Sequence, residues 1–220
     1  MGAFLVLEGP EGGGKTSHAR ALANKIAEAG CRTVLTREPG GTGLGDVIRG
    51  IVLPAGSVPI SPRSEALLYC ASRAQLVDEV VRPALEEGQV VISDRYSFST
   101  IAYQGYGRGL DVRMLTAATR FSTSGLKPDL CILLDLPPTV GLERKRGAFL
   151  AGGVDEWNRF EQEEVAFHQR VRNGYLQLAR SDPARWVVLD ATLPFDTLQD
   201  RITEEVFFLL YRKRVLRRPT

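Results

Sequence analysis

The stretch from Phe4 to Thr16, FLVLEGPEGGGKT, constrains the fold of this chain more than any other feature. An apolar run ends at Glu8, and the next eight residues follow the pattern G-x-x-x-x-G-K-T. Periodicity predicts a strand over 3–7 and a helix over 15–29 on either side of the pattern. In that setting the backbone amides cradle phosphate oxygens, the lysine reaches the β- and γ-phosphates, and the hydroxyl can bind Mg²⁺. We therefore expect a nucleotide site formed by Gly9, Pro10, Glu11, Gly12, Gly13, Gly14, Lys15 and Thr16.

The rest of the chain alternates short apolar strands with amphipathic helices. Further strands are predicted over 32–36, 89–93, 129–134 and 186–189. Further helices are predicted over 44–53, 62–87, 98–104, 111–123, 138–147, 158–180 and 195–212. This alternation predicts an α/β fold with a mostly parallel sheet covered by helices on both faces. A chain of 220 residues is long enough for one good core, so we expect a single domain over 1–220.

Composition excludes several classes of protein. The longest apolar runs are too short to span a bilayer, and the chain starts without a basic leader, so we expect a cytoplasmic protein and no membrane partner. The three cysteines are widely spaced in apolar surroundings, which argues against a metal cluster or disulfide framework. Net charge is +2, but five of the last nine residues are basic, and the remainder is net negative. We therefore expect no nucleic-acid partner, and interpret the tail as a solvated helix end.

Two apolar runs end in an aspartate that could help position Mg²⁺. These are VVISD, ending at Asp94, and CILLD, ending at Asp135. Asp94 is followed by Arg95 and Tyr96, which would place a cation beside the phosphates, whereas Asp135 runs into Leu-Pro-Pro, typical of a turn and helix start. We favour Asp94, with Thr16, as the metal-binding pair.

A basic segment over 144–159, RKRGAFLAGGVDEWNR, lies between two predicted helices. It can be interpreted as an exposed loop with solvated charges. It can also be interpreted as a lid that brings Arg144, Arg146 or Arg159 to a transferring phosphoryl group. We favour the lid, because the phosphate-binding loop itself supplies one cation, Lys15.

Tyr69 and Arg73 lie four residues apart on one face of the helix predicted over 62–87. An aromatic ring and a guanidinium so placed could be ordinary packing at the edge of the core, or could stack on and hydrogen-bond a flat ligand. Periodicity leaves both interpretations open. A guanine-specific switch is disfavoured, because Asn24-Lys25 continues into Ile-Ala inside a predicted helix, where N-K-x-D would be required.

Taken in order, the motifs resemble those of bacterial thymidylate kinases. The match comprises EGPEGGGKT at 8–16, REPGGT at 37–42, LLYCASRAQ at 67–75, DRY at 94–96, STIAYQG at 99–105, LDLPP at 134–138 and RFE at 159–161. The resemblance implies a P-loop kinase fold with a five-stranded parallel sheet, ATP and Mg²⁺ as cofactors, and a homodimer. It also implies transfer of the γ-phosphate of ATP to dTMP, on the route to dTTP.

The resemblance also implies roles for matched residues. Tyr69 would stack on the thymine ring, and Arg73 would hydrogen-bond its exocyclic oxygen. The other implied substrate positions are Thr100 and Gln104 near the base, Tyr103 against the sugar, Arg37 and Arg95 at the acceptor phosphate, and Glu11 near the sugar or the phosphoryl path. The alternatives are a kinase for another nucleotide or a deoxynucleoside, and a non-kinase nucleotide switch.

Gly12 and the lid set this chain apart within the resemblance. In one type of the family the catalytic arginine lies inside the phosphate-binding loop; in the other the loop has glycine there and the lid is basic. Gly12 matches the second type. The lid departs from its usual form, because residues 147–158 are GAFLAGGVDEWN and Asn158 stands where an aspartate would precede Arg159. Asp155 could replace that acid, or could be unrelated to it.

Overall fold

A five-stranded parallel sheet forms the centre of the structure, a computed structural model that describes residues 2–54, 58–151 and 158–216. The strands are β1 (Ala3–Glu8), β2 (Thr33–Arg37), β3 (Val90–Asp94), β4 (Leu130–Asp135) and β5 (Trp186–Asp190), in the order β2-β3-β1-β4-β5. Each predicted strand is confirmed, with ends that agree to within one or two residues. Because β1 is central and fully buried, its apolar run is continuous and not alternating.

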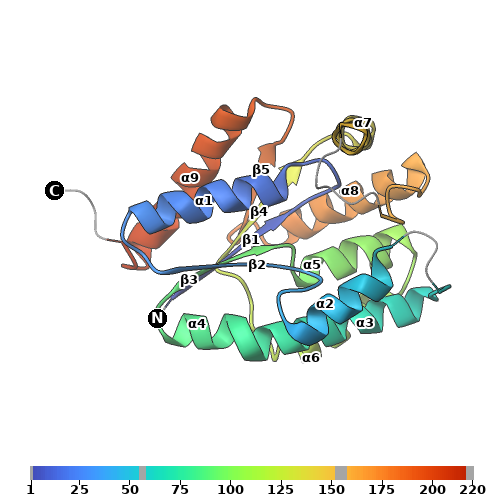
Figure 1. The fold of residues 1–220 in the computed structure, drawn as a ribbon, viewed down its shortest axis with the longest axis horizontal. Coiled ribbons are helices and arrows are strands. Elements are labelled where there is room, and N and C mark those ends of the chain that lie inside the picture. The colour runs from blue at the N-terminus through green and yellow to red at the C-terminus, as the bar shows by residue number, and fades with distance from the viewer. Residues whose placement is uncertain (1, 55–57, 152–157, 217–220) are drawn as a thin grey trace.

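Helices cover both faces of the sheet, as predicted (Figure 1). On one face, α1 (Lys15–Glu28) and α9 (Phe195–Arg212) bury Leu22, Ile26 and Ile202 against the strands. On the other face lie α3 (Pro62–Leu76), α4 (Arg82–Glu86) and α8 (Val165–Ser181). The remaining helices in the described residues are α2 (Gly43–Val52), α5 (Ser97–Thr100), α6 (Val112–Ser122) and α7 (Pro138–Leu150).

The long helix predicted over 62–87 is divided by a π-helical turn, η1 (Val77–Val81), between α3 and α4. Pro83 is the second residue of α4, just after this turn, and a proline has no backbone N–H to continue the ladder of α-helical hydrogen bonds. The helix predicted over 98–104 is likewise α5 followed by a second π-helical stretch, η2 (Ile101–Gly107). Both segments are helical, but their hydrogen-bond register was not predicted.

The helix predicted over 158–180 was wrong at its start, because α8 begins at Val165. Residues 158–161 instead form a turn closed by side chains: Glu161 accepts hydrogen bonds from the backbone N and Nδ2 of Asn158, and Asn158 Oδ1 accepts from the backbone N of Phe160. Asparagine commonly bonds local backbone in this way, in competition with helix formation. Residues 152–157 of the predicted lid, including Asp155, lie outside the described residues.

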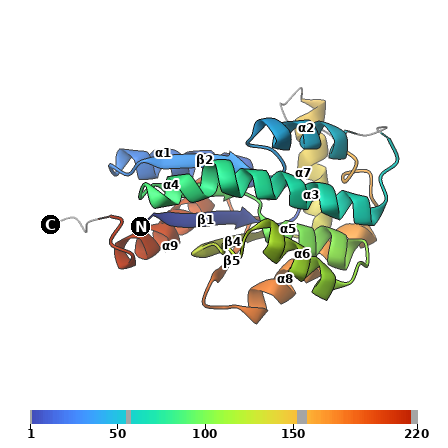
Figure 2. The ribbon, with the colours of Figure 1, turned by 90° about the horizontal axis from the view of Figure 1, so that it is seen from below.

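The carboxyl ends of the strands meet at one edge of the sheet, where the phosphate-binding loop joins β1 to α1 (Figures 1 and 2). There the backbone of α7 lies directly on the loop. A Cβ added to Gly12 would be 2.1 Å from the carbonyl oxygen of Gly141, and one added to Gly141 would be 2.2 Å from the carbonyl oxygen of Glu11. The space at Gly12 is therefore filled by α7, and no side chain fits there without moving one of the two segments.

Within the described residues, no helix is long and apolar enough to cross a bilayer. The three cysteines are free thiols, with Cys70 and Cys131 buried and Cys31 half-buried.

Candidate active site

A cavity of about 590 Å³ opens at the carboxyl ends of the strands. It extends from the phosphate-binding loop past the ends of β2 and β3 to α3 and η2. The predicted site residues that line it are Glu11, Gly12, Gly14, Lys15, Thr16, Arg37, Tyr69, Arg73, Asp94, Arg95, Thr100, Tyr103 and Gln104. Ligand sites of open α/β sheets lie at this edge, where side chains from separate strands converge.

Lys15 begins α1 and is buried, with 7% of its surface exposed. Its Nζ donates to the carbonyl oxygen of Pro10 at 2.7 Å, which bends the side chain back over the loop. Burial and the nearby charge of Arg95 lower the pKa of Lys15 to about 8, against the opposing effect of Glu11. Lys15 is thus a buried cation close to a second positive charge. An anionic ligand bound beside it would favour its charged form.

Thr16, in the first turn of α1, lies next to Asp94, at the end of β3; these two residues are the predicted metal-binding pair. Thr16 Oγ1 donates to Asp94 Oδ2 at 2.5 Å. A hydroxyl and a carboxylate are the hard oxygen donors that suit Mg²⁺, which usually keeps waters and phosphate oxygens for its other positions. The competing Asp135 accepts two hydrogen bonds from Arg172 at 2.8 Å each and is held in that ion pair. The chemistry of the donors therefore fits Mg²⁺ at Asp94.

Arg95 joins the loop to η2 and α8. Its Nη2 donates to Glu11 Oε1 at 2.7 Å and to the Tyr103 hydroxyl at 3.1 Å, while Nη1 donates to the Gly9 carbonyl at 3.0 Å. Arg95 has a left-handed backbone with φ +73°, uncommon for a residue with a side chain. Its backbone N donates to the carbonyl oxygen of Leu7 at 2.9 Å. The conformation is thus tied to β1.

Glu11 faces three cations across the cavity. Besides its ion pair with Arg95, its Oε1 accepts from the Tyr103 hydroxyl at 2.8 Å. Burial alone would raise the pKa of Glu11, but Arg95 and Lys15, with a smaller contribution from Lys145, lower it to about 2. The carboxylate is therefore charged throughout the neutral range. The Glu11 carboxylate therefore lies close to the cations that an anionic ligand in the cavity would also contact.

Three residues that sequence reasoning did not select position Arg95, two by direct hydrogen bonds and one through those two. Ser99 Oγ and the Tyr175 hydroxyl accept hydrogen bonds from Nη1 at 3.3 and 3.2 Å. The buried Glu8 accepts in turn from Ser99 Oγ and from the Tyr175 hydroxyl, at 2.7 and 2.9 Å. Burial raises the pKa of Glu8, although Arg95 opposes the shift. Glu8 and Ser99 belong to motifs quoted above, but Tyr175, from α8, carries no local signal in the sequence.

Arg73 is the largest fully buried side chain of the site, at 1% exposure. Its Nε donates to Glu38 Oε2 at 2.8 Å, and Nη2 donates to Thr100 Oγ1 at 2.9 Å. The Nη1 atom of Arg73 and the Oε1 atom of Glu38 are buried without a hydrogen-bond partner. Burial raises the pKa of Glu38 to about 7, with Arg73 opposing. Buried donors left unpaired are costly, so an unpaired guanidinium nitrogen at a cavity wall favours a ligand over plain packing.

Glu65, also missed from the sequence, organises the far end of the cavity. Its Oε1 accepts from Gln104 Nε2 at 2.6 Å and lies 3.5 Å from Arg108 Nε, and its Oε2 lies 2.5 Å from Arg159 Nη2. Phe160 packs there on Tyr103, with the Arg159 guanidinium over its ring. Arg159 is therefore anchored at the Tyr69 end of the cavity and does not line it.

The other predicted lid arginines also point elsewhere. Arg144 Nη1 donates to the carbonyl oxygen of Ala191 at 2.7 Å, in the segment after β5, and Arg146 is exposed. Neither lines the cavity, whereas Lys145, between them in the sequence, does. Arg37, predicted at the acceptor phosphate, lies at the mouth of the cavity with its side chain about half exposed, 3.9 Å from Asp46.

Comparisons with known proteins point in one direction. The model of the family described as thymidylate kinase matches residues 7–202. A thymidylate kinase of Deinococcus radiodurans is 50% identical over 202 residues, which cover 92% of this chain and 95% of the relative. That of Thermomicrobium roseum is 49% identical, covering 97% and 99%. The crystal structure of thymidylate kinase from Ehrlichia chaffeensis superposes with a TM-score of 0.74 at 26% identity, covering 94% of this chain and 98% of that one.

Proposed function

The chain belongs to the thymidylate kinase family, and from that premise we propose that it transfers the γ-phosphoryl group of ATP to the phosphate of dTMP. The family uses ATP as donor. The observation that supports this function best is the continuity of the cavity: one space is lined by the phosphate-binding loop at one end and by Tyr69 and Arg73 at the other. A donor and a flat acceptor can therefore meet inside it.

On the donor side, the loop amides and Lys15 bind the triphosphate, and Thr16 and Asp94 hold Mg²⁺. When bound, the metal neutralises charge on the phosphate oxygens. The short contact between Thr16 and Asp94 supports this assignment, because it brings the hydroxyl at the start of α1 next to the carboxylate at the end of β3.

On the acceptor side, Arg95 and Arg37 bind the phosphate of dTMP, and Tyr69, Arg73, Thr100 and Gln104 bind the base. The unpartnered Nη1 of Arg73 supports a hydrogen bond from this atom to an exocyclic oxygen of thymine. Thr100 and Glu38 hold the guanidinium in place for it. Tyr103, held by Glu11 and Arg95, would lie against the sugar and disfavour a 2′-hydroxyl.

In the reaction, an oxygen of the acceptor phosphate attacks the γ-phosphorus. The bond from that phosphorus to the β–γ bridging oxygen breaks, and its electron pair leaves with ADP. The nucleophile is already an anion, so no covalent intermediate or strong base is required, and catalysis rests on positioning and charge stabilisation. Arg95 and Lys15 both line the cavity where the reacting groups would meet. Contacts of the predicted lid arginines support anchoring roles, Arg144 at the segment after β5 and Arg159 at Glu65.

A panel of acceptors with coupled detection of ADP tests the proposal. We expect dTMP to be the best substrate and dUMP to be roughly 10-fold poorer, because a single methyl group in an apolar pocket contributes about 1–3 kcal/mol to discrimination. Lys15→Met should lower kcat by about 10² to 10³, the usual effect of losing one such donor. Faster reaction of dCMP or thymidine would indicate another acceptor, and ADP formation that ignores every acceptor would indicate a switch.

We further propose that two copies of the chain associate through α2, α3 and α6, which pack side by side (Figure 2). Val47, Leu67, Met114 and Phe121 are exposed large apolar side chains on these helices, and Phe121 is 88% exposed. Exposed apolar side chains gathered on one face are typical of an interface. The homodimer implied by the family resemblance would bury them.

A further inference from the structure

The helix α7 presents one face to the phosphate-binding loop. Gly141 packs against the backbone of Glu11 and Gly12 with no side chain between. Lys145 follows four residues later and Ala148 three after that, and both line the cavity. Residues at spacings of four and three lie on one face of a helix, so the contact at Gly141 determines which cation of α7 faces the site.

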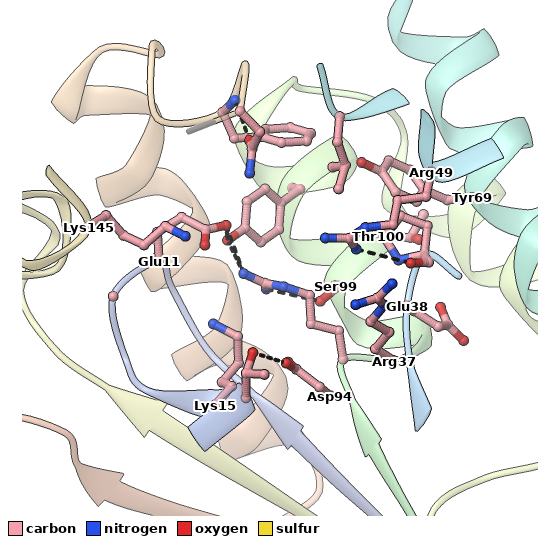
Figure 3. Close-up of a pocket in the computed structure, with 18 of the residues that line it drawn as sticks. Glu11, Lys15, Arg37, Glu38, Arg49, Tyr69, Asp94, Ser99, Thr100 and Lys145 are labelled. Atoms are coloured by element: carbon pink, nitrogen blue, oxygen red, sulfur yellow. Dashed lines mark hydrogen bonds and ion pairs between the residues drawn. The ribbon is translucent and has the colours of Figure 1, made fainter. Parts of the chain in front are cut away.

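Lys145 enters the cavity from that face (Figure 3). Its side chain is 15% exposed, and Nζ lies 3.6 Å from Glu161 Oε1. Figure 3 shows its ammonium beside the carboxylate of Glu11, with Lys15 and Asp94 lower in the same view. Together with Arg95 and Lys15, it contributes to the low pKa of Glu11. An anion between the loop and α7 would therefore face these same cations.

The neighbouring cations on α7 do not line the same space. Each helical residue is turned by about 100° from the last, so Arg144 and Arg146 lie on faces away from Lys145. Arg144 is committed to the carbonyl oxygens of Ala191 and Thr192, at 2.7 and 3.4 Å. Arg146 is exposed. Gly12 leaves the loop itself without a side chain at the position where the other type of the family carries its arginine.

We propose that Lys145 is the catalytic cation of the lid, and that its ammonium contacts the oxygens of the γ-phosphoryl group during transfer. This inference rests on the proposed kinase function. As the γ-phosphorus passes from the bridging oxygen of ATP to the dTMP oxygen, the ammonium donates to its equatorial oxygens and keeps its own proton. Glu161 is a positioning residue, which together with Glu11 holds the ammonium over the loop before the substrates bind.

Lys145→Met, which keeps the length of the side chain and removes the charge, is the primary test. We expect kcat for dTMP to fall by about 10² to 10³, as for other single donors to a transition state, with KM values for ATP and dTMP changed by less than about threefold. Lys145→Arg should restore at least a tenth of the activity, roughly, because it restores the charge. Lys127→Met, on an exposed loop, is the matched control, and Arg146→Met tests the competing cation on the same helix.

A second measurement separates catalysis from folding. Binding of ADP, aluminium fluoride and dTMP, which together mimic the transferring group, should weaken in Lys145→Met in proportion to kcat, while binding of ATP alone does not. Normal kcat in Lys145→Met, or an equal loss in Arg146→Met, would overturn the inference. So would a loss of kcat in a variant that is folded by circular dichroism but has unchanged affinity for the mimic. Failure of the proposed function is distinct, because the unmodified enzyme would then show no dTMP-dependent formation of ADP.

Discussion

At the scale of single residues, Arg95 determines the arrangement of the site more than any other side chain. It contacts the loop through Gly9 and Glu11, η2 through Tyr103, and α8 through Tyr175. Its left-handed backbone is what turns the guanidinium from the end of β3 back toward the loop. The sequence shows an arginine after a strand, but not this turn, because the conformation depends on contacts with β1 and with the segment at Ser99.

The lowered pKa of Lys15 predicts a pH dependence of ATP binding. Burial and Arg95 reduce this pKa from 10.5 to about 8, so the free enzyme loses the cation as pH rises through about 8. Because the triphosphate favours the charged form, the Kd for a non-hydrolysable ATP analogue should rise above pH 8 by up to about 10-fold per pH unit. Calorimetric titration between about pH 7 and pH 9.5 measures it.

Lys15→Arg is the control for this profile, since a guanidinium stays charged throughout that range. Its affinity for the analogue should vary little with pH, whatever its absolute value. A flat profile for the unmodified enzyme, with the fold intact by circular dichroism, would contradict the assigned pKa. Glu11, with its pKa near 2, stays charged over the same range and does not contribute to the change.

Sequence reasoning predicted many of the residues that line the cavity but not Lys145, because the sequence does not show how α7 is rotated. Lys15, Thr16, Asp94 and Arg95 follow strands directly, so their place at the sheet edge could be predicted from order alone. Arg144, Lys145 and Arg146 are consecutive in a helix, and which of them faces the loop depends on the rotation of α7. That rotation is determined by the contact between Gly141 and Gly12, which is tertiary.

At the scale of elements, the close contact of α7 with the loop predicts opposite effects for two glycines of one helix. Gly141→Ala would bring a Cβ to 2.2 Å from the backbone oxygen of Glu11 and must push the segments apart. We expect a loss of about 1–3 kcal/mol in unfolding free energy, with kcat reduced by about 10-fold or more, because the loop is displaced from the phosphates.

Gly147→Ala is the matched control, because a Cβ there meets nothing within 4 Å. It should raise the unfolding free energy by about 0.4–1 kcal/mol, since alanine costs less backbone entropy than glycine in a helix, and leave kcat unchanged. Urea unfolding and steady-state kinetics of both variants make the comparison. Equal effects at the two positions would show that the contact is not tight.

The turn before α8 predicts a pH-dependent stability. Burial and the charge of Glu11 raise the pKa of Glu161 from 4.5 to about 7. A raised pKa means that the folded state binds the proton more tightly, so this contribution to stability is complete below about pH 4.5 and is lost as pH rises through about 7. Glu161→Gln keeps a neutral side chain, so its stability relative to the unmodified protein should increase across that window.

Thermal unfolding at about pH 5 and about pH 8 provides the measurement, with Glu204→Gln, exposed on α9, as control. A difference between Glu161→Gln and the unmodified protein that stays constant with pH would contradict the shift.

The elements themselves were predicted well, for reasons of periodicity. Strands buried on both faces read as continuous apolar runs, and α1, α2, α6 and α9 agree to within one or two residues. The π-helical turns η1 and η2 were not predicted, because they differ from α-helix only in hydrogen-bond register. The start of α8 was missed because Asn158 and Glu161 bond the local backbone, which an amphipathic pattern does not reveal.

At the scale of the whole molecule, the proposed dimer face carries several large apolar side chains that are exposed to water, among them Met114 and Phe121. Phe121→Asp would place a charge at its most exposed apolar side chain, and we expect this variant to be monomeric. The unmodified protein should have twice the 24.2 kDa mass of the chain. A stable dimer would bury roughly 800 Å² on each copy. Because a few residues contribute most of the binding energy of such an interface, one charged substitution at its centre is expected to prevent association.

Light scattering after size-exclusion chromatography distinguishes the two masses. Phe208→Asp, on α9 and outside this face, is the control and should leave the dimer intact. A monomeric unmodified protein, or dissociation in both variants, would contradict the choice of α2, α3 and α6. A cytoplasmic location and the absence of nucleic-acid binding stay predictions from the sequence.

The backbone contact between Gly141 and Gly12 fixes the rotation of α7 about its own axis. Only the residues of α7 on the same face as Gly141 therefore point their side chains toward the phosphate-binding loop. A single uncharged residue inserted between 141 and 145 would turn Lys145 by about 100° relative to Gly141, with no change in the overall charge. In this segment, the length of the chain between two points matters as much as which cations it contains.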